Sequence, residues 1–179
     1  MKSPRRVMVI VGSDSDLPQC ARGLKHLIEA KTAGLITTIK GKEIITASVH
    51  RHLLTVQRAL LLRNELDVII AGAGMAAHLP GMIDSILRYE LEDYRLVIIG
   101  VAFSGKTKKA NLAARLSISQ VPGTQVVFED GHGFYFGEEG FSRACKFAIS
   151  ENLPIIKKPD PRPTYSREFA EVIEMQKTQ

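Results

Sequence analysis

The sequence predicts a single α/β domain built on a parallel sheet with right-handed crossovers, and three observations support this prediction. Short runs of apolar, β-branched residues lack polar alternation, as expected for strands that are buried on both faces. Each run is followed by a segment in which apolar residues recur at helical spacing. The chain has 179 residues, 45% of them hydrophobic, which is enough for a substantial core without a disulfide or a metal.

The first strand–helix unit organises the rest of the chain. Residues 7–11 form the first predicted strand, and Gly12 then allows a tight turn with close backbone approach. Asp16 is expected to cap the following helix, in which apolar residues recur at helical spacing over 17–28.

The turn between this strand and helix is also a candidate anion site. Free backbone N–H groups at a helix start favour a negative charge, and Ser13 and Ser15 add hydroxyl donors. An ordinary capped turn explains the same residues equally well, so this stretch alone leaves both interpretations open.

The remaining chain repeats the strand–helix pattern. Residues 31–42 form a polar, glycine-punctuated connection, and 131–140 are expected to be a lid, an inter-subunit loop or a hairpin packed on the domain. The proline-rich stretch 154–163 is not expected to be helical, whereas 167–176 could form a terminal helix. The further predicted strands are 43–48, 67–71, 95–101 and 125–128, and the further predicted helices are 53–64, 82–89, 109–116 and 141–151.

This topology brings three polar stretches together. Residues 13–16, 48–52 and 72–78 each follow a predicted strand. Because parallel strands end at the same end of a sheet, where ligands bind in such folds, we expect the three stretches to form one site.

Two histidines in these stretches are candidate acid–base groups. His50 lies between Ser48 and Arg51; an imidazole can donate or accept a proton, and the Arg51 guanidinium offers a permanent charge for phosphate or carboxylate. His78 lies among apolar residues. The structural alternatives are a solvated His–Arg pair on a surface loop and a core histidine held by one hydrogen bond.

The composition argues against several classes of function. The net charge of +5 suits an anionic partner, but the few aromatic residues do not interleave with the basic ones, so nucleic-acid binding is not expected. No apolar run approaches the roughly 20 residues of a membrane helix, so we expect a cytoplasmic protein without a membrane partner. Cys20 and Cys145 belong to no C-x-x-C pair and are expected to be buried free thiols, and no metal-site spacing is visible.

Three blocks of the sequence resemble the signature segments of the PurE family. They are 12–16, 48–51 and 71–82, each following a predicted strand, and the resemblance extends over roughly 7–128. The family comprises the catalytic subunits of phosphoribosylaminoimidazole carboxylase, also called N5-carboxyaminoimidazole ribonucleotide (N5-CAIR) mutase.

The resemblance implies a flavodoxin-like, three-layer α/β sandwich that needs neither a metal nor an organic cofactor. It implies carboxyl transfer on an aminoimidazole ribonucleotide in purine biosynthesis, an isomerase or lyase reaction in which His50 moves the proton at C4 and His78 assists. The positions that would bind the small-molecule ribonucleotide are Ser13, Ser15, Asp16, Ser48 and Arg51 on the ribose 5-phosphate side, and Gly74, Ala76 and Leu79 around the CO2 and the imidazole.

The chain departs from the family pattern in places that bear on the substrate. Val49 stands where the family usually has alanine, and the loop 103–109 differs from the usual segment. Arg51, in place of lysine, favours the mutase over a direct carboxylase. The alternatives are an aminoimidazole ribonucleotide (AIR) carboxylase that uses CO2, a paralogue acting on another nucleotide, and a non-catalytic nucleotide-phosphate binding module.

The domain organisation follows from the same comparison. Residues 1–153 are expected to form a single domain of this type, and 154–179 a C-terminal extension docked on that domain or on a neighbouring subunit. The resemblance also implies a homo-oligomer, an octamer.

Overall fold

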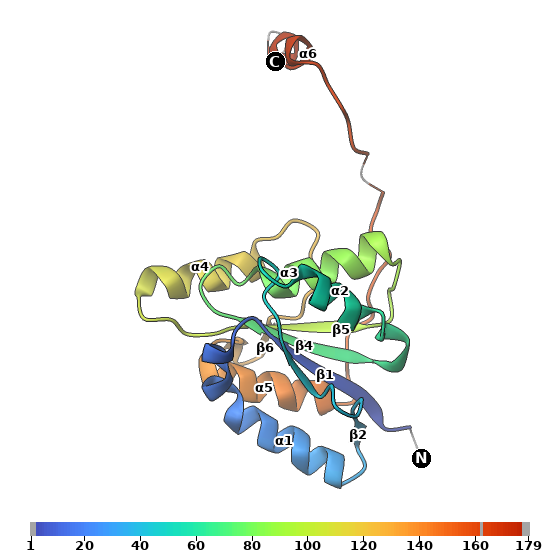
Figure 1. Cartoon of the computed structure of the whole chain (residues 1–179), viewed down its shortest axis with the longest axis vertical. Helices are drawn as coiled ribbons and strands as arrows, with labels where there is room; N and C mark the ends of the chain where they lie inside the picture. Colours follow the sequence, from blue (N-terminus) through green and yellow to red (C-terminus); the bar gives the residue numbers. More distant parts are fainter. Residues whose placement is uncertain (1–2, 162, 177–179) are drawn as a thin grey trace.

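The computed structural model describes residues 3–161 and 163–176 (Figure 1). The strands are β1 (Arg5–Val11), β2 (Ile36–Thr37), β3 (Ile44–Thr46), β4 (Val68–Ala73), β5 (Val97–Ala102), β6 (Glu129–Asp130) and β7 (Gly133–Phe134). The α-helices are α1 (Ala21–Thr32), α2 (Leu53–Leu60), α3 (His78–Ser85), α4 (Lys108–Ser119), α5 (Gly137–Ile149) and α6 (Phe169–Gln176). Shorter turns are the 3₁₀ segments η1 (Asp14–Cys20) and η2 (Arg63–Glu65) and the π segment η3 (Ile86–Glu90).

The main sheet is parallel and has a flavodoxin-like strand order. β1 pairs with β2 and β3 on one side and with β4 on the other, as Val9 shows by facing both Ile44 and Ile70. β5 follows β4, and a parallel bridge between Ile99 and Val127 extends the sheet beyond β5. The chain therefore builds the sheet first to one side of β1 and then to the other, which creates a topological switch point between β1 and β4.

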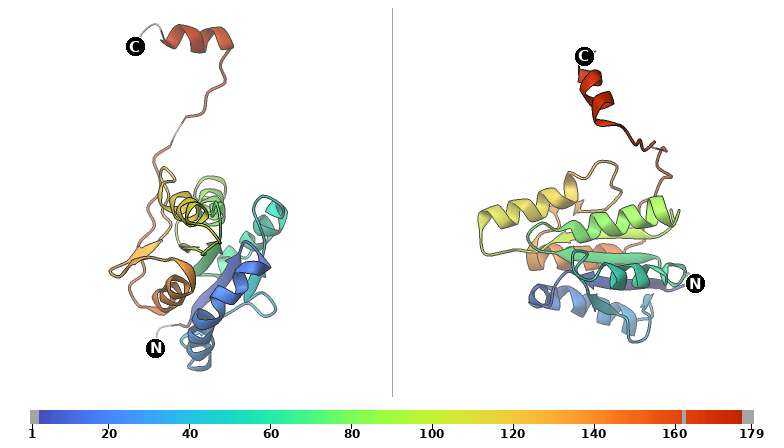
Figure 2. Two further views of the ribbon diagram at one scale, coloured as in Figure 1. Left: turned by 90° about the vertical axis from the view of Figure 1, so that its left-hand side faces the viewer. Right: turned by 45° about the horizontal axis from the view of Figure 1, so that its top comes forward.

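Helices cover both faces of this sheet. Helices α1 and α5 lie against one face, and α2, α3 and α4 lie against the other (Figures 1 and 2). Alternate residues of one strand serve the two sides: Met8 and Ile10 belong to one buried cluster, and Val7 and Val9 to the other. Burial on both faces confirms the predicted α/β sandwich and explains the strands' lack of polar alternation.

The segment 125–128 is not the strand that its composition predicts. Val127 alone pairs with β5: its N–H donates to Ile98 O at 2.9 Å, and its carbonyl accepts from Gly100 N at 2.8 Å. The two preceding N–H groups go to side chains, from Gln125 to Asp84 Oδ2 and from Val126 to Thr124 Oγ1. The Gln125 N–H is the next donor that would face β5, and because it is already bonded to Asp84 the ladder does not extend through it.

Two helix starts also differ from the prediction. Asp16 does not cap the first helix. Ser13, in an extended conformation, instead caps the 3₁₀ segment η1 by accepting the Ser15 N–H, and η1 leads into α1 without a further side-chain cap. Helix α3 begins at His78 instead of residue 82, because Pro80 lies in its first turn, where a missing N–H costs nothing. His78 therefore stands on a helix end.

The C-terminal third combines a hairpin, a helix and an extended tail. Of the three alternatives for residues 131–140, the structure has a hairpin, β6–β7, and α5 then begins at Gly137, earlier than the predicted residue 141. The tail stays against the domain as far as Lys157, whose backbone N–H and C=O both bind the side chain of Gln125. Beyond it, α6 stands clear of the sheet and its covering helices (Figures 1 and 2). The docking predicted for this extension stays a prediction.

Candidate active site

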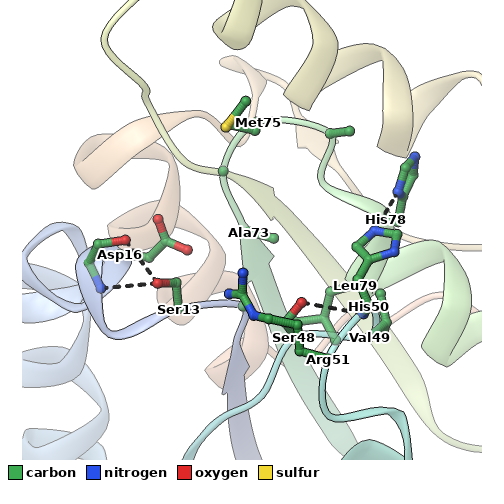
Figure 3. Close-up of a pocket in the computed structure, with 14 residues that line it drawn as sticks. Ser13, Asp16, Ser48, Val49, His50, Arg51, Ala73, Met75, His78 and Leu79 are labelled. Carbon is green, nitrogen blue, oxygen red and sulfur yellow. Dashed lines mark hydrogen bonds between the residues drawn. The ribbon is translucent and has the colours of Figure 1, made fainter.

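A cavity of about 410 Å³ opens at the carboxyl ends of β1 and β4, at the switch point of the sheet (Figure 3). All the predicted site residues line it, which are Ser13, Ser15, Asp16, Ser48, His50, Arg51, Gly74, Ala76, His78 and Leu79. The convergence predicted from the topology is therefore present in the structure. Three segments form its walls: 13–16, 48–51 and 74–79.

The first wall carries two hydroxyl groups and a carboxylate. Ser13 Oγ and Ser15 Oγ lie 2.9 Å apart and form a hydrogen-bonded pair. Asp16 is turned inward and is only 9% exposed. Burial raises the pKa of the Asp16 carboxyl above its usual range, and a hydrogen bond from the Gly74 backbone N–H opposes this rise.

The second wall is a turn closed by hydrogen bonds to Ser48. The N–H of His52 donates to Ser48 O at 2.6 Å, and the N–H of His50 donates to Ser48 Oγ at 3.3 Å. These bonds present His50 and Arg51 at the surface of the cavity, and Val49, which precedes His50, is buried. Within the described part of the chain, no acidic side chain pairs with Arg51, so its guanidinium is available to an anionic ligand.

The third wall approaches the ligand space with its backbone. Gly12 and Ala73 pack so closely where β1 and β4 end that a Cβ added at Gly12 would lie 3.0 Å from Ala73 Cβ. A Cβ at Gly74 would lie 3.3 Å from Asp16 Oδ1. These contacts confirm the close backbone approach predicted at Gly12.

Met75 has a left-handed backbone, with φ of +50°, which is rare for a residue with a side chain. Such strained positions concentrate at functional sites. Met75, Val49 and Ala73 also line the cavity; they are not among the individually predicted site residues, although all three lie within the stretches 48–52 and 72–78 that the sequence predicts to form one site. Val49 and Ala73 directly flank predicted site residues and could have been inferred from them, whereas nothing in the sequence marks Met75 for this conformation.

The two candidate histidines meet across the second and third walls. His50 Nε2 lies 2.9 Å from His78 Nδ1, and the two rings form a T-shaped pair with centroids 5.0 Å apart (Figure 3). One ring must donate and the other accept, so at least one of them is neutral when the bond is formed. The alternatives of a solvated surface pair for His50 and a core histidine for His78 do not describe this arrangement, in which a proton can pass between the rings.

The cavity thus combines three kinds of chemistry. Arg51 and the serine hydroxyl groups offer positive charge and donors for an anion, and Asp16 offers a buried acceptor. The hydrogen-bonded His50–His78 pair can give and take a proton. The small and apolar side chains between these groups leave room for a flat ring, and these apolar members are Val49, Ala73, Ala76 and Leu79.

Residues 3–161 and 163–176 contain no group of three or more His, Cys, Asp or Glu side chains that could hold a metal ion, and no helix there is long and apolar enough to cross a membrane. Both cysteines are free and buried as predicted, and burial raises the pKa of Cys20 to about 12, which leaves it an unreactive thiol.

Comparison with known proteins agrees with the fold. A family model described as AIR carboxylase matches residues 6–128, which is more than half of the chain. The chain is 38% identical over 123 residues to the N5-carboxyaminoimidazole ribonucleotide mutase of Thermotoga maritima, covering 66% of this chain and 61% of that protein. It is 38% identical over 128 residues to the mutase of Pyrococcus horikoshii, covering 68% and 62%.

A eukaryotic relative carries a different name. The phosphoribosylaminoimidazole carboxylase of Candida albicans is 38% identical over 103 residues, covering 56% of this chain and 16% of that longer protein. The match therefore spans about three fifths of the two mutases and a small part of the carboxylase. Since the matched family model covers all three walls of the cavity and the parallel sheet that carries them, the chain belongs to the AIR carboxylase family.

Proposed function

We propose that this protein converts N5-CAIR into its C4-carboxylated isomer, CAIR, a carboxyl transfer in purine biosynthesis. The observation that carries the proposal is the pairing of His50 Nε2 with His78 Nδ1 at 2.9 Å in the same cavity as the Arg51 guanidinium, which forms no ion pair within the described residues. The names of the mutases from Thermotoga maritima and Pyrococcus horikoshii support this choice of reaction.

The phosphate end of the substrate lies at the first and second walls in this proposal. Arg51 binds the 5′-phosphate, and the hydroxyl groups of Ser13, Ser15 and Ser48 donate further hydrogen bonds to it. Asp16 accepts a hydrogen bond from a ribose hydroxyl group, a role that suits a carboxylate whose burial has removed it from water.

The reacting end lies at the third wall and the histidine pair. The bond between N5 and the carbamate carbon breaks as N5 takes a proton from protonated His50, and the released CO2 stays among Ala76, Leu79 and the Gly74 backbone. The C4 carbon of the imidazole ring then attacks CO2, and His50 accepts the proton that C4 loses. His78 takes up or returns that proton through the Nε2–Nδ1 hydrogen bond, so the site ends with the protons it began with.

A direct AIR carboxylase is the second candidate, because the Candida albicans relative carries that name. In that reaction, CO2 enters from solution instead of from the carbamate, and the same proton leaves C4. We infer action in the cytoplasm, a reducing compartment that suits the two buried free thiols.

Assays with two substrates test the proposal. Purified protein is given N5-CAIR in one assay, and AIR with bicarbonate in the other. We expect CAIR from N5-CAIR. Product only from AIR, at a rate that rises with bicarbonate, would identify the direct carboxylase. No product from either would contradict both reactions and favour another nucleotide or a non-catalytic binding module.

A histidine variant tests the proton transfer. His50→Asn removes the acid–base group and should lower kcat by about 10²–10⁴-fold, the usual contribution of a positioned acid–base residue. His132→Asn, on the exposed β6–β7 turn, is the matched control and should retain full activity. Wild-type turnover by His50→Asn would rule out the role of His50.

We also propose that the protein is a homo-octamer in which the extension 154–179 covers a neighbouring subunit. Helix α6 exposes Phe169, Val172 and Ile173 on one stripe, and an isolated helix of eight residues is marginal in water unless this stripe is packed. Light scattering should show a smaller assembly when Phe169 and Ile173 are both replaced by glutamate. An unchanged mass would contradict this use of the extension.

A further inference from the structure

The segment that follows β5 is tied to the first wall of the cavity by one side chain, Gln19. Gln19 Oε1 accepts hydrogen bonds from Ser104 N at 2.9 Å and from Ser104 Oγ at 2.8 Å, and Gln19 Nε2 donates to Ser104 O at 3.1 Å. A single glutamine thus uses the backbone donor, the backbone acceptor and the hydroxyl group of Ser104. We call these three bonds the Gln19–Ser104 clamp.

The clamp connects the first wall of the cavity with the segment that packs against the third wall. Gln19 lies in η1, the turn that begins beside Ser13 and carries Ser15 and Asp16. On the other side, Phe103 precedes Ser104 and packs against the third wall. The bond from Phe103 N to Ala73 O is 2.9 Å, a Cβ on Gly72 would lie 2.5 Å from the Phe103 ring, and a Cβ on Gly74 would lie 3.8 Å from Phe103 O.

The start of α5 closes over the clamp. Gly137 has a φ of +62°, and a Cβ there would lie 3.7 Å from Gln19 Oε1 and 3.9 Å from Ser104 Oγ. A glycine at this position therefore lets the backbone of α5 approach both partners closely.

The segment after β5 has anchors besides the clamp. Gly105 N donates to Asn111 Oδ1 at 2.7 Å, and Thr107 Oγ1 caps α4 by accepting the Ala110 N–H at 3.1 Å. Loss of the clamp should therefore leave this segment folded but free to shift relative to η1. The predicted consequence is a change in geometry, without unfolding.

We propose that Gln19 is a positioning residue for the phosphate-binding wall: it holds η1 against Ser104 and Phe103 and so sets the distance between the Ser13–Ser15 hydroxyl groups and the third wall. This proposal rests on the proposed function for the identity of the ligand. The His50–His78 pair belongs to the other two walls, and none of the three clamp bonds involves either histidine. Gln19 should therefore affect substrate binding and leave the proton-transfer step unchanged.

Substitutions at both ends of the clamp test this proposal, with binding of ribose 5-phosphate measured by calorimetry. Gln19→Met removes all three bonds at a similar volume and should raise the Kd about threefold to tenfold, the range expected for lost hydrogen bonds. Ser104→Ala removes only the hydroxyl bond and should have a smaller effect. The double variant should match Gln19→Met, since the hydroxyl bond is already lost there.

Kinetics with N5-CAIR provide the second readout. KM should rise by the same factor as the Kd, and kcat should stay at the wild-type value. Gln57→Met, an exposed glutamine on α2, is the matched control and should change neither constant. If Gln19→Met fails to fold, Ser104→Ala and the KM-to-kcat comparison still test the clamp.

The outcomes separate this proposal from the proposed function. An unchanged Kd and KM in Gln19→Met, a fall in kcat alone, or an equal loss in Gln57→Met would overturn the role of Gln19. A wild-type protein that binds no ribose 5-phosphate would overturn it as well. A wild-type protein that binds ribose 5-phosphate but turns over neither nucleotide would overturn the proposed function alone, since the Kd series still measures the clamp.

Discussion

The amino and carboxyl ends of the parallel sheet use charged side chains in opposite ways. At the amino end, acids and bases are paired with one another. Arg6 binds Asp67 with Nη2 and Oδ1 2.6 Å apart, and Arg88, 1% exposed, binds Asp84 with Nε and Oδ1 3.0 Å apart. Asp93 accepts hydrogen bonds from two backbone N–H groups and from a guanidinium. These charged groups stabilise the fold and, being paired with one another, are not available to a ligand.

At the carboxyl end, the charged groups have few partners within the described chain. Arg51 is exposed and makes no ion pair there, and His50 bonds through its ring only to His78. The charged groups at the amino end are used within the fold, whereas those at the carboxyl end remain available to a ligand, as expected where loops rather than strands carry function.

Two aspartates show the same contrast in their pKa values. Burial acts to raise the pKa of both Asp16 and Asp67. For Asp67, hydrogen bonds and charge from Arg6 outweigh burial and hold the pKa below its usual range. For Asp16, only the Gly74 N–H opposes burial, and the pKa stays raised. Among the described residues, no basic side chain lies beside Asp16 to lower its pKa as Arg6 does for Asp67.

The largest effect on stability is expected at the amino end. Arg88→Met removes the guanidinium that binds Asp84, the Leu96 carbonyl and the Asp93 carbonyl, and it leaves a buried carboxylate unpaired. Urea unfolding should show a loss of about 3–5 kcal/mol in the free energy of unfolding. Arg95→Met is the control: that guanidinium is 60% exposed, and its loss should cost less than about 1 kcal/mol. Equal losses in both variants would contradict the contrast.

The corresponding change at the carboxyl end should affect binding and leave stability unchanged. Arg51→Met removes the cation proposed for the phosphate, and calorimetry with ribose 5-phosphate should show a loss of about 1.5–3 kcal/mol in binding free energy. Its Tm should equal that of the wild type. Arg58→Met, an exposed position on α2, should change neither quantity. A lower Tm with unchanged binding would assign Arg51 to the fold instead.

Acid titration should separate the two aspartates by sign. The lowered pKa of Asp67 stabilises the fold above the unfolded value of about 3.9, and this stabilisation is lost as the pH falls through the folded pKa. At pH 7 the wild type should therefore be more stable than Asp67→Asn. The difference should be less than about 1 kcal/mol because the Arg6–Asp67 pair is partly exposed, and it should shrink below pH ~4.

The raised pKa of Asp16 has the opposite effect. The charged carboxylate costs stability once the pH rises through the folded pKa, so Asp16→Asn should be more stable than wild type at pH 7. This advantage should disappear as the pH falls below the unfolded value of about 3.9. Urea unfolding at pH 3, 5 and 7 measures both differences, and the same sign in both variants would contradict the comparison.

The smallest effect is expected from backbone strain at the rim of the cavity. Met75→Gly relieves the strain of a left-handed backbone but adds the entropic cost of a glycine. The relief should be the larger of the two, so the free energy of unfolding should rise by less than about 1 kcal/mol. Ala76→Gly, at the next residue and without a positive φ, should lose about 0.5–1 kcal/mol. Thermal unfolding compares the two variants, and equal losses would show that the conformation of Met75 carries no strain.

Much of the fold follows from local patterns. The runs 7–11, 67–71 and 95–101 predicted β1, β4 and β5 because apolar strands buried on both faces have no polar alternation. The segment 125–128 has similar composition, yet it forms a single bridge because Asp84, far away in sequence, takes the Gln125 N–H. Composition shows that a segment suits a strand, but not which partner its backbone donors find.

In the candidate site, too, some features follow from the sequence and others only from the tertiary structure. The sequence by itself determined which residues meet, because three polar stretches that end parallel strands must lie at the same end of the sheet. Only the tertiary structure decided how they meet: the hydrogen bond between His50 and His78, the inward turn of Asp16 and the strained backbone of Met75. Those features depend on distances between segments far apart in the chain, and the packing of the whole domain sets these distances.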